Sequence, residues 1–272
     1  MLGRNHAAMG LLLGESLLMV GHVNSSSVVP VLIGLTAGSL WPDVDEPNSL
    51  VSRSFGLISM AFASGVNRIS GGHRQATHSP IGIALMSSCA YLLGLSHLGH
   101  LILAIGAVFI VLKSVVPWSV RVFALGGTIG AAVISLFVGV WLSGVGLLPL
   151  VLGFGLGSLI HLLGDWVTPS GVPWLWPLSS HHFSLDLWST DSFTEHLVGL
   201  GLWAVVLLGG WHLIGAVALP SVSPTSAVHS TLASKGFHNM LNYVALRVDH
   251  VITATIGKLQ TTVAALMQHH GI

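Results

Sequence analysis

The sequence predicts an all-α fold, a polytopic membrane bundle with about seven spans and one interfacial helix. Hydrophobic residues make up 52% of the 272 residues and charged residues only 7%, whereas soluble domains carry about 25% charged residues. The apolar residues also gather in long stretches, and a spanning helix needs about 20 mostly apolar residues. Membrane lipids are therefore the expected surroundings of most of this chain.

Net charge and cysteine content exclude two other classes. The formal net charge is zero, which argues against nucleic acid as a partner, because a nucleic-acid binder needs a basic face. Cys89 is the single cysteine, so neither an intramolecular disulfide framework nor a cysteine-based zinc site is available. The sequence carries no signal for an oligomeric state.

Hydropathy divides the chain into a membrane-embedded domain, residues 1–219, and a linker with a helical tail, residues 220–272. The tail is a candidate site for a protein partner. Residues 53–69 are apolar with Arg at both ends, a pattern typical of a helix that lies along the membrane interface or re-enters it. The seven predicted spans are residues 7–23, 28–41, 80–96, 98–116, 122–142, 145–163 and 197–219.

The cations predict how these spans are oriented. If the spans alternate from a cytoplasmic N-terminus, all six cations before residue 220 fall on the cytoplasmic side. The opposite loops, around residues 24, 97 and 143, carry none, as the positive-inside rule requires. The multi-pass chain therefore has a cytoplasmic N-terminus. The six cations are Arg4, Arg53, Arg68, Arg74, Lys113 and Arg121.

The acids are confined to two segments. Seven of the nine Asp and Glu lie between residues 43 and 46 or between residues 165 and 195. The predicted topology puts these acids, and several His, on the cytoplasmic face, although the spans were drawn from hydropathy and oriented by Lys and Arg alone. This agreement predicts a polar site on that face.

Asp43 and Asp45 form the first candidate motif. Pro42 and Pro47 flank them and hold the segment out of regular helix. Two carboxylates in Asp-x-Asp spacing are a common way to hold hard or borderline cations. A helix-capping turn is the simpler interpretation, and the neighbouring His motifs favour a metal site.

His73 and His78 form the second motif, just before the third span. At this spacing they need not share a helix face, but a loop can bring them together, and neutral imidazole is the commonest side-chain metal ligand. Arg74 lies between them and can hold a phosphate or carboxylate through bidentate hydrogen bonds.

His161 and Asp165 form the third motif, at the end of the sixth span. Residues i and i+4 face the same way on a helix, so an imidazole and a carboxylate would converge on one ion. In the simpler interpretation Asp165 only orients His161. Ionisable groups at membrane helix ends are costly and usually functional, which favours ligation.

Two further candidates have weaker signals. His6 starts the first span and is either a ligand or an interfacial histidine. Glu195 starts the seventh span, where it could act as a general base or could simply favour a helix N-terminus.

The motifs share their order with a known family. They run PDxDxPNS, GHRxxTHS, then HLLxDxxTPSGVxxLWP followed by FSL. This combination resembles the YdjM-type family of bacterial inner-membrane proteins, which are described as metal-dependent hydrolases, over about residues 1–219. His6 fits the N-terminal histidine of that family. The matching residues are Pro42, Asp43, Asp45, Pro47, Asn48, Ser49, Gly72, His73, Arg74, Thr77, His78, Ser79, His161, Leu162, Leu163, Asp165, Thr168, Pro169, Ser170, Gly171, Val172, Leu175, Trp176, Pro177, Phe183, Ser184 and Leu185.

The resemblance implies a protein of the bacterial inner membrane with a metal-dependent hydrolase activity. One branch of the family is described as binding the SOS repressor LexA, and the motifs do not bear on that link. The chain departs from the family pattern at residues 179–182, Ser-Ser-His-His, where basic residues are common. This departure weakens any anionic-lipid contact at that point.

We therefore expect a membrane-bound hydrolase with a cytoplasm-facing site for one or two divalent ions, zinc first and manganese as the alternative. Asp45 or Glu195 would act as general base, and Arg74 would stabilise charge on a phosphoryl or acyl oxygen. A lipid or lipid-linked phosphoester suits a site at the membrane surface. The predicted metal ligands are His6, Asp43, Asp45, His73, His78, His161 and Asp165.

Two other functions stay open at this stage. A transporter or metal-handling protein would line a path with polar residues of the spans, such as Glu15, His22 and His100. A noncatalytic membrane scaffold would use the metal only to hold its loops together.

Overall fold

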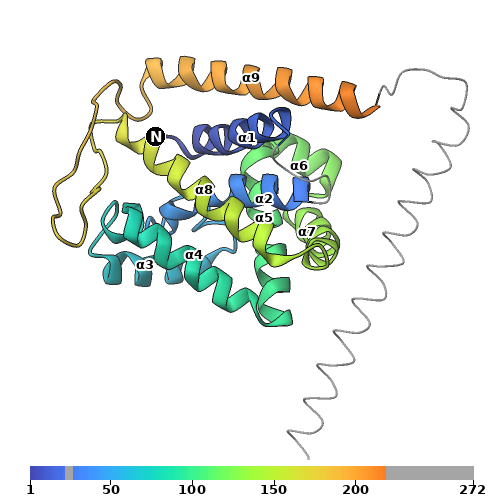
Figure 1. The fold of residues 1–272 in the computed structure, drawn as a ribbon, viewed down its shortest axis with the longest axis horizontal. Helices are drawn as coiled ribbons and strands as arrows, with labels where there is room; N and C mark the ends of the chain where they lie inside the picture. Colours follow the sequence, from blue (N-terminus) through green and yellow to red (C-terminus); the bar gives the residue numbers. More distant parts are fainter. Residues whose placement is uncertain (22–26, 219–272) are drawn as a thin grey trace, which may run out of the picture. The chain divides into compact units, whose positions relative to one another are not determined.

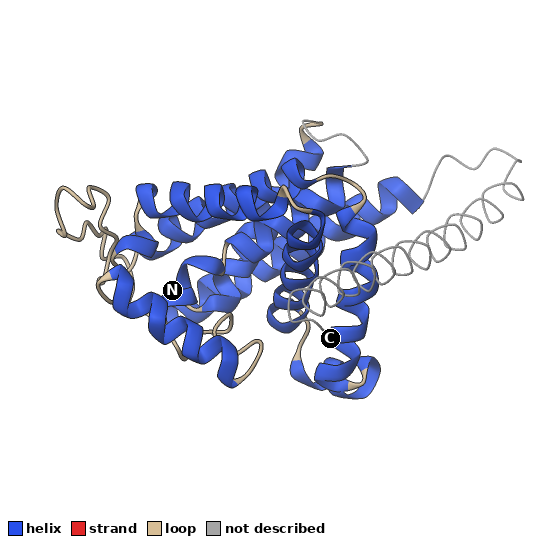
Figure 2. Cartoon of the chain, turned by 90° about the horizontal axis from the view of Figure 1, so that it is seen from below, coloured by secondary structure: helices blue, strands red, loops and turns tan. Residues whose placement is uncertain are grey.

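The computed structural model describes residues 1–21 and 27–218. Within these residues helices joined by loops make up the fold (Figure 2), and the strand-like pairing is one isolated antiparallel bridge between Val172 and Phe183. The predicted all-α class is thus confirmed. The helices are α1 (Gly3–Met19), α2 (Val28–Gly38), α3 (Leu57–Ser70), α4 (Pro80–Gly94), α5 (His97–Val115), α6 (Trp118–Leu125), α7 (Gly127–Ser143), α8 (Leu147–Trp166) and α9 (Phe193–Ala218), with short 3-10 turns η2 (Trp41–Asp45) and η3 (Ala76–His78).

Three of the described helices are long and apolar enough to cross a membrane, namely α5, α8 and the Phe193–Gly210 part of α9. The helices α2, α4 and α7 are apolar but shorter. The count of seven spans therefore stays a prediction. The predicted tail, residues 220–272, lies outside the described residues.

Glycines end or interrupt helices where the sequence predicted continuous spans. The predicted fifth span begins at residue 122, but the chain breaks between α6 and α7 at Gly126 and Gly127. Both have positive φ, 71° and 70°, a backbone conformation that residues with a Cβ rarely adopt. Similarly, the predicted second span runs to residue 41, whereas α2 ends at Gly38 and a 3-10 turn around Pro42 follows.

The bundle is built on close packing of α2 against α8 (Figure 1). Gly34 and Gly38 of α2 face Gly153 and Gly157 of α8 across this contact, so the two backbones touch directly. Small residues are the usual means of close helix approach in membranes, where association depends on van der Waals packing. α1 then lies between α2 and α9, and α5 packs against α7.

Because the helices run in alternating directions, several helix ends meet at the left of Figure 1. They are the N-terminal ends of α1, α4 and α9 and the C-terminal ends of α2 and α8. The turns η2 and η3 and the long loop of residues 167–192 lie at the same end of the bundle. All three predicted motifs are therefore carried by segments that meet there.

The α2–α8 contact makes a testable prediction. A Cβ at Gly38 would overlap the backbone carbonyl of Phe154, which cannot move aside as a flexible side chain could. Gly38→Ala should therefore lower the free energy of unfolding by about 1–3 kcal/mol. Gly106→Ala on α5 is the matched control, because nothing lies within 4 Å of its added Cβ. Thermal unfolding of both variants in detergent would measure the difference, and equal unfolding temperatures would contradict the packing argument.

Candidate metal centre

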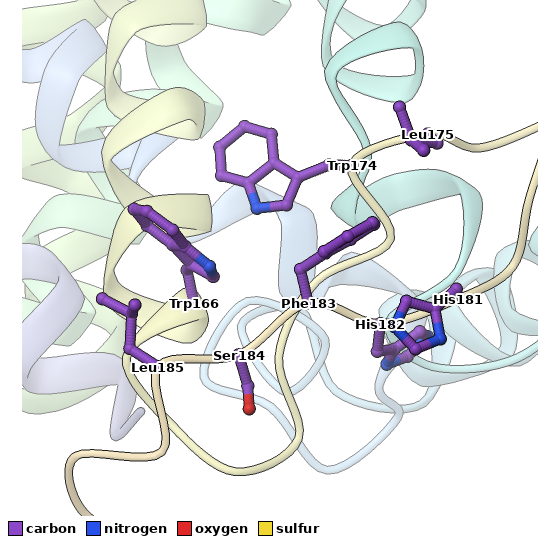
Figure 3. Close-up of a pocket in the computed structure, with 8 residues that line it drawn as sticks. All are labelled: Trp166, Trp174, Leu175, His181, His182, Phe183, Ser184 and Leu185. Atoms are coloured by element: carbon purple, nitrogen blue, oxygen red, sulfur yellow. The ribbon is translucent and has the colours of Figure 1, made fainter.

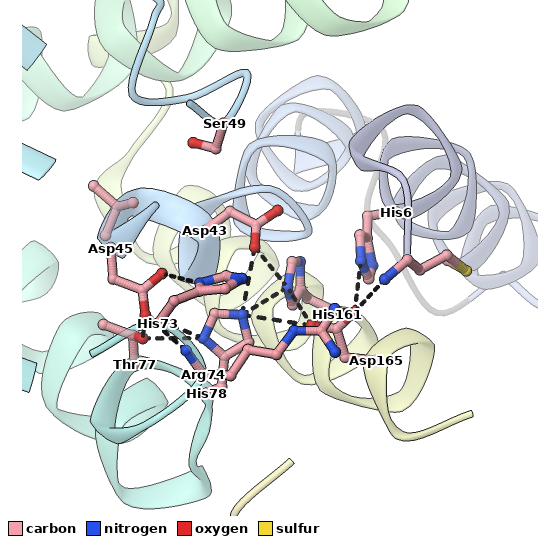
Figure 4. Close-up of polar contacts among 12 residues, drawn as sticks. His6, Asp43, Asp45, Ser49, His73, Arg74, Thr77, His78, His161 and Asp165 are labelled. Carbon is pink, nitrogen blue, oxygen red and sulfur yellow. Dashed lines mark hydrogen bonds and ion pairs between the residues drawn. The ribbon is translucent and has the colours of Figure 1, made fainter. Parts of the chain in front are cut away.

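Four side chains from three segments converge at this end of the bundle (Figure 4). Asp43 comes from η2, His78 from η3, and His161 with Asp165 from the last turns of α8. One ligand atom from each of them lies within 4.8 Å of all the others. Three segments that lie 35 to 122 residues apart in sequence thus gather their side chains around one point.

The spacing of these atoms fits a tetrahedral cation. Zinc bonds of about 2.0–2.1 Å in a tetrahedron separate neighbouring ligand atoms by about 3.3 Å. His78 Nε2 lies 3.2 Å from His161 Nε2, 3.4 Å from Asp43 Oδ1 and 3.5 Å from Asp165 Oδ2. His161 Nε2 lies 3.5 Å from Asp43 Oδ1 and 3.3 Å from Asp165 Oδ2. Five of the six edges therefore match the geometry of a bound ion.

Hydrogen bonds on the outer side fix both imidazoles for ligation. His161 Nδ1 must donate to the carbonyl of Ser39, 2.7 Å away, because a carbonyl only accepts. Thr77 gives its hydroxyl hydrogen to Asp45 Oδ2, so its oxygen accepts from His78 Nδ1 at 3.0 Å. Each ring thus holds a hydrogen on Nδ1 and turns Nε2 toward the centre, the arrangement typical of metal-bound histidine.

The two oxygens of buried Asp165 have different surroundings. Oδ1 accepts from Arg74 Nη2 at 2.9 Å and from the amino group of Met1 at 2.6 Å. Oδ2 has no hydrogen-bond partner and faces the two Nε2 atoms. A buried carboxylate oxygen without a donor is costly, and a cation at the centre would satisfy it. The residues therefore fit a divalent metal ion.

The charges of the loop residues support this interpretation. Burial alone would lower the pKa of His78, but hydrogen bonds with Asp43 and Asp45 and the charge of Asp165 raise it to about 9. Burial would raise the pKa of Asp43, yet the neighbouring His161 and His78 hold it below its ordinary value. The site thus holds positive charge between carboxylates even without an ion.

Asp45 and His73 lie beside the four donors in a different arrangement. Asp45 accepts from Thr77, from the backbone N–H of Arg74 and from His73 Nδ1, and the His73 contact is 2.8 Å. Burial would raise the pKa of Asp45, but hydrogen bonds with His73, His78 and Thr77 and the charge of His78 hold it below its ordinary value. The contact with His73 is shorter than the spacing of two ligands on one ion. The geometry therefore favours Asp45 as the group that orients His73 and His78.

His6 lies on the other side of the centre. Its ring stacks on His161 with centroids 3.7 Å apart, and its Nε2 is 3.3 Å from Asp165 Oδ1. Neither ring nitrogen has a hydrogen bond of good geometry, although the side chain is fully buried. His6 therefore packs on the ligand His161 outside the four donors, and Asp165 Oδ1 beside it already accepts from Arg74 and from the amino group of Met1.

Arg74 and Glu195 are both engaged with the protein. Arg74 has a positive φ of 62°, uncommon outside glycine, and its guanidinium binds Asp165 and the hydroxyl of Thr168. Glu195 accepts from the backbone N–H groups of Leu2 and Asp191 and from the Asn5 amide. Glu195 thus joins the start of α1 to the start of α9, apart from the four donors.

Sequence reasoning missed the residues that orient the ligands. Thr77 and Thr168 stand inside the recognised motifs, and a hydroxyl next to a predicted ligand was the available signal. Ser39 contributes only its backbone carbonyl, for which a sequence has no signal.

A pocket of about 610 Å³ lies between the end of α8 and the long loop that follows it (Figure 3). Trp166 and Trp174, whose rings meet edge to face at 5.8 Å, line it together with residues 175 and 181–185. Trp166 directly follows the ligand Asp165. His182 accepts a 3.3 Å hydrogen bond from Gln75, the neighbour of Arg74. The pocket is therefore linked to the donors through the end of α8 and through the hydrogen bond of Gln75.

A family model described as YdjM inner membrane protein matches residues 1–237. The chain belongs to this family. The resemblance carried by the three motifs is thus confirmed, and membership of the YdjM family shows a protein of the inner membrane. The family description names a location and no reaction. Comparisons with curated proteins and with solved structures found no match.

The raised pKa of His78 predicts how metal binding depends on pH. Below about pH 9 the His78 ring of the metal-free protein carries a second proton, on Nε2, in addition to the one on Nδ1. A cation can bind Nε2 only after that second proton leaves. Below that pH, the apparent dissociation constant for zinc should therefore fall about tenfold for each pH unit of increase. Calorimetric titration of metal-depleted protein between about pH 6 and pH 8 would measure this slope. A pH-independent constant would contradict the prediction.

Proposed function

We propose that this protein is a membrane-bound, metal-dependent hydrolase whose site faces the cytoplasm. The observation that carries the proposal is the set of four donor atoms at tetrahedral spacing, with both imidazoles already turned toward the centre. The cytoplasmic orientation is supported by the distribution of Lys and Arg in the sequence.

Asp43, His78, His161 and Asp165 would hold the ion. Two imidazole nitrogens and two carboxylate oxygens suit zinc, with manganese as the alternative. A bound ion of this kind supplies Lewis acidity, which activates water for attack at neutral pH. Asp43 is the only one of the four with an exposed side chain, 18%, so the approach of water and substrate is from its side.

His73 is our candidate for moving the proton, in place of Asp45 and Glu195. Its Nδ1 is held by the buried Asp45 carboxylate at 2.8 Å, and its side chain is 34% exposed. Nε2 is then free to take a proton from water and return it to a leaving group. The carboxylate fixes the tautomer and stabilises the charged ring, while Arg74 fixes Asp165.

A lipid or lipid-linked phosphoester is the substrate class that we propose. The pocket at the end of α8 is lined largely by aromatic and aliphatic side chains, as ligand sites for apolar groups are. Leucines of the same loop are strongly exposed, including Leu178 and Leu187. A loop of this character next to a metal centre suits a substrate that is drawn from the bilayer.

A structural metal site in a noncatalytic scaffold is the second candidate. The observation that favours it is the number of protein donors, since four close a tetrahedral zinc site whereas catalytic sites keep an open position. The partial exposure of Asp43 favours the hydrolase instead. A transporter is less well supported, because the donors lie at one end of the bundle and a path needs polar groups at several depths.

The metal site can be tested by elemental analysis of the detergent-purified chain. We expect about one or more equivalents of zinc or manganese in the parent and loss of the ion in Asp165→Asn, which removes a ligand charge at constant side-chain size. His97→Ala is the control, because His97 is exposed on α5 and apart from the centre. A parent without metal after reconstitution would sink both the hydrolase and the structural site.

A His73→Gln variant separates the two candidate functions. If His73 moves the proton, the variant keeps its metal and loses about 10²- to 10⁴-fold in hydrolysis of phosphodiester substrates, with an altered pH profile. The parent is assayed with bis(p-nitrophenyl) phosphate and with detergent-dispersed phospholipids. A metal-loaded parent that hydrolyses neither would leave the structural site as the better explanation.

A further inference from the structure

The helix α3 turns its apolar face outward. Leu57, Ile58 and Ile69 are 83%, 82% and 90% exposed, and Phe62 is also exposed. The opposite face, which packs on the protein, buries Ala63 and part of Val66 and also carries the polar side chains of Ser59, Asn67 and Ser70, each in a hydrogen bond. A helix at a water-exposed surface carries mainly polar residues on its outer face. The outer face of α3 therefore requires an apolar partner.

The length and the ends of α3 restrict that partner. Fourteen residues make a helix about 21 Å long, too short for a hydrocarbon core of about 30 Å. Two exposed cations flank the helix, Arg53 before it and Arg68 in its last turn. A short helix with an apolar face and terminal cations suits a membrane interface with anionic headgroups.

We propose that the outer face of α3 is buried in the cytoplasmic leaflet, with Arg53 and Arg68 at the level of anionic lipid headgroups. The bilayer is the occupant that charge favours. A second copy of the chain, paired through a two-fold axis, would bring the same cations of both copies onto one surface. Membership in an inner-membrane family already places the chain beside lipid.

Lipid contact at α3 would reach the metal-binding loop directly. Asn67 Nδ2 donates to the backbone carbonyl of Asp45 at 2.8 Å, and Ser59 donates to the carbonyl of Ser52. Val66 packs against the buried cluster that includes Val44, the residue between Asp43 and Asp45. The bilayer surface thus helps to set the position of the loop. The lipid contact itself does not depend on the hydrolase proposal.

Spin labels test the proposal on the full chain in nanodiscs of phosphatidylethanolamine and phosphatidylglycerol. Cys89 is exposed, so the background is Cys89→Ser, and single labels are attached through Ile58→Cys and Ile69→Cys. Both sites point away from the protein, so the labels leave its packing intact. Asp191→Cys provides the reference for water, because its side chain is 73% exposed in a loop.

We expect both α3 labels to be far more accessible to oxygen than to a water-soluble nickel chelate, and the reference label to show the opposite. Depth calibration should place the α3 labels about 5–10 Å below the headgroup level. Labels accessible to nickel would overturn the proposal in favour of a solvated helix. Labels shielded from both reagents, with spin–spin broadening that disappears on dilution with unlabelled protein, would overturn it in favour of a second copy.

Discussion

The neutralisation of buried carboxylates is the constraint on which the rest of this structure depends. Asp165 and Asp45 are fully buried at the end of an apolar bundle, where an unpaired charge would be prohibitively costly. Arg74 satisfies one oxygen of Asp165, and Thr77 and His73 satisfy Asp45. What is left is Asp165 Oδ2 and two inward Nε2 atoms, and a cation is the chemical group that satisfies all three at once.

The packing of α2 against α8 holds the metal-binding side chains at fixed distances from one another. Direct backbone contact of α2 with α8, through Gly38 and Gly157, places the Ser39 carbonyl 2.7 Å from His161 Nδ1. The η2 turn that carries Asp43 starts only two residues later. A larger residue at the crossing would therefore shift the ligand loop as well as the helices, so packing and ligation are properties of the same contact.

Local pattern made the helical class and part of the site predictable from sequence. His161 and Asp165 are one helical turn apart, and their convergence follows from helix geometry alone. The role of Asp45 did not follow, because its partners Thr77 and His73 come from another loop and their approach is set by tertiary packing. Glu195 looked available as a base for the same reason, since its bonds to Leu2 and Asn5 span 193 and 190 residues. The number of spans did not follow either. Whether a helix crosses the membrane depends on its contact with the bilayer, whereas hydropathy gives only the length and composition of an apolar stretch.

Access to the centre follows from what covers it. The start of α1 closes one side, because His6 stacks on His161 and Glu195 ties Leu2 and Asn5 to α9. The open side is the one where the partly exposed Asp43 and His73 lie. That side is carried by the loop to which Asn67 of α3 is hydrogen-bonded. If α3 lies in the leaflet, the loop that carries Asp43 is held next to the lipid surface by its hydrogen bond with Asn67. A substrate held in the bilayer then has a short route to the metal centre.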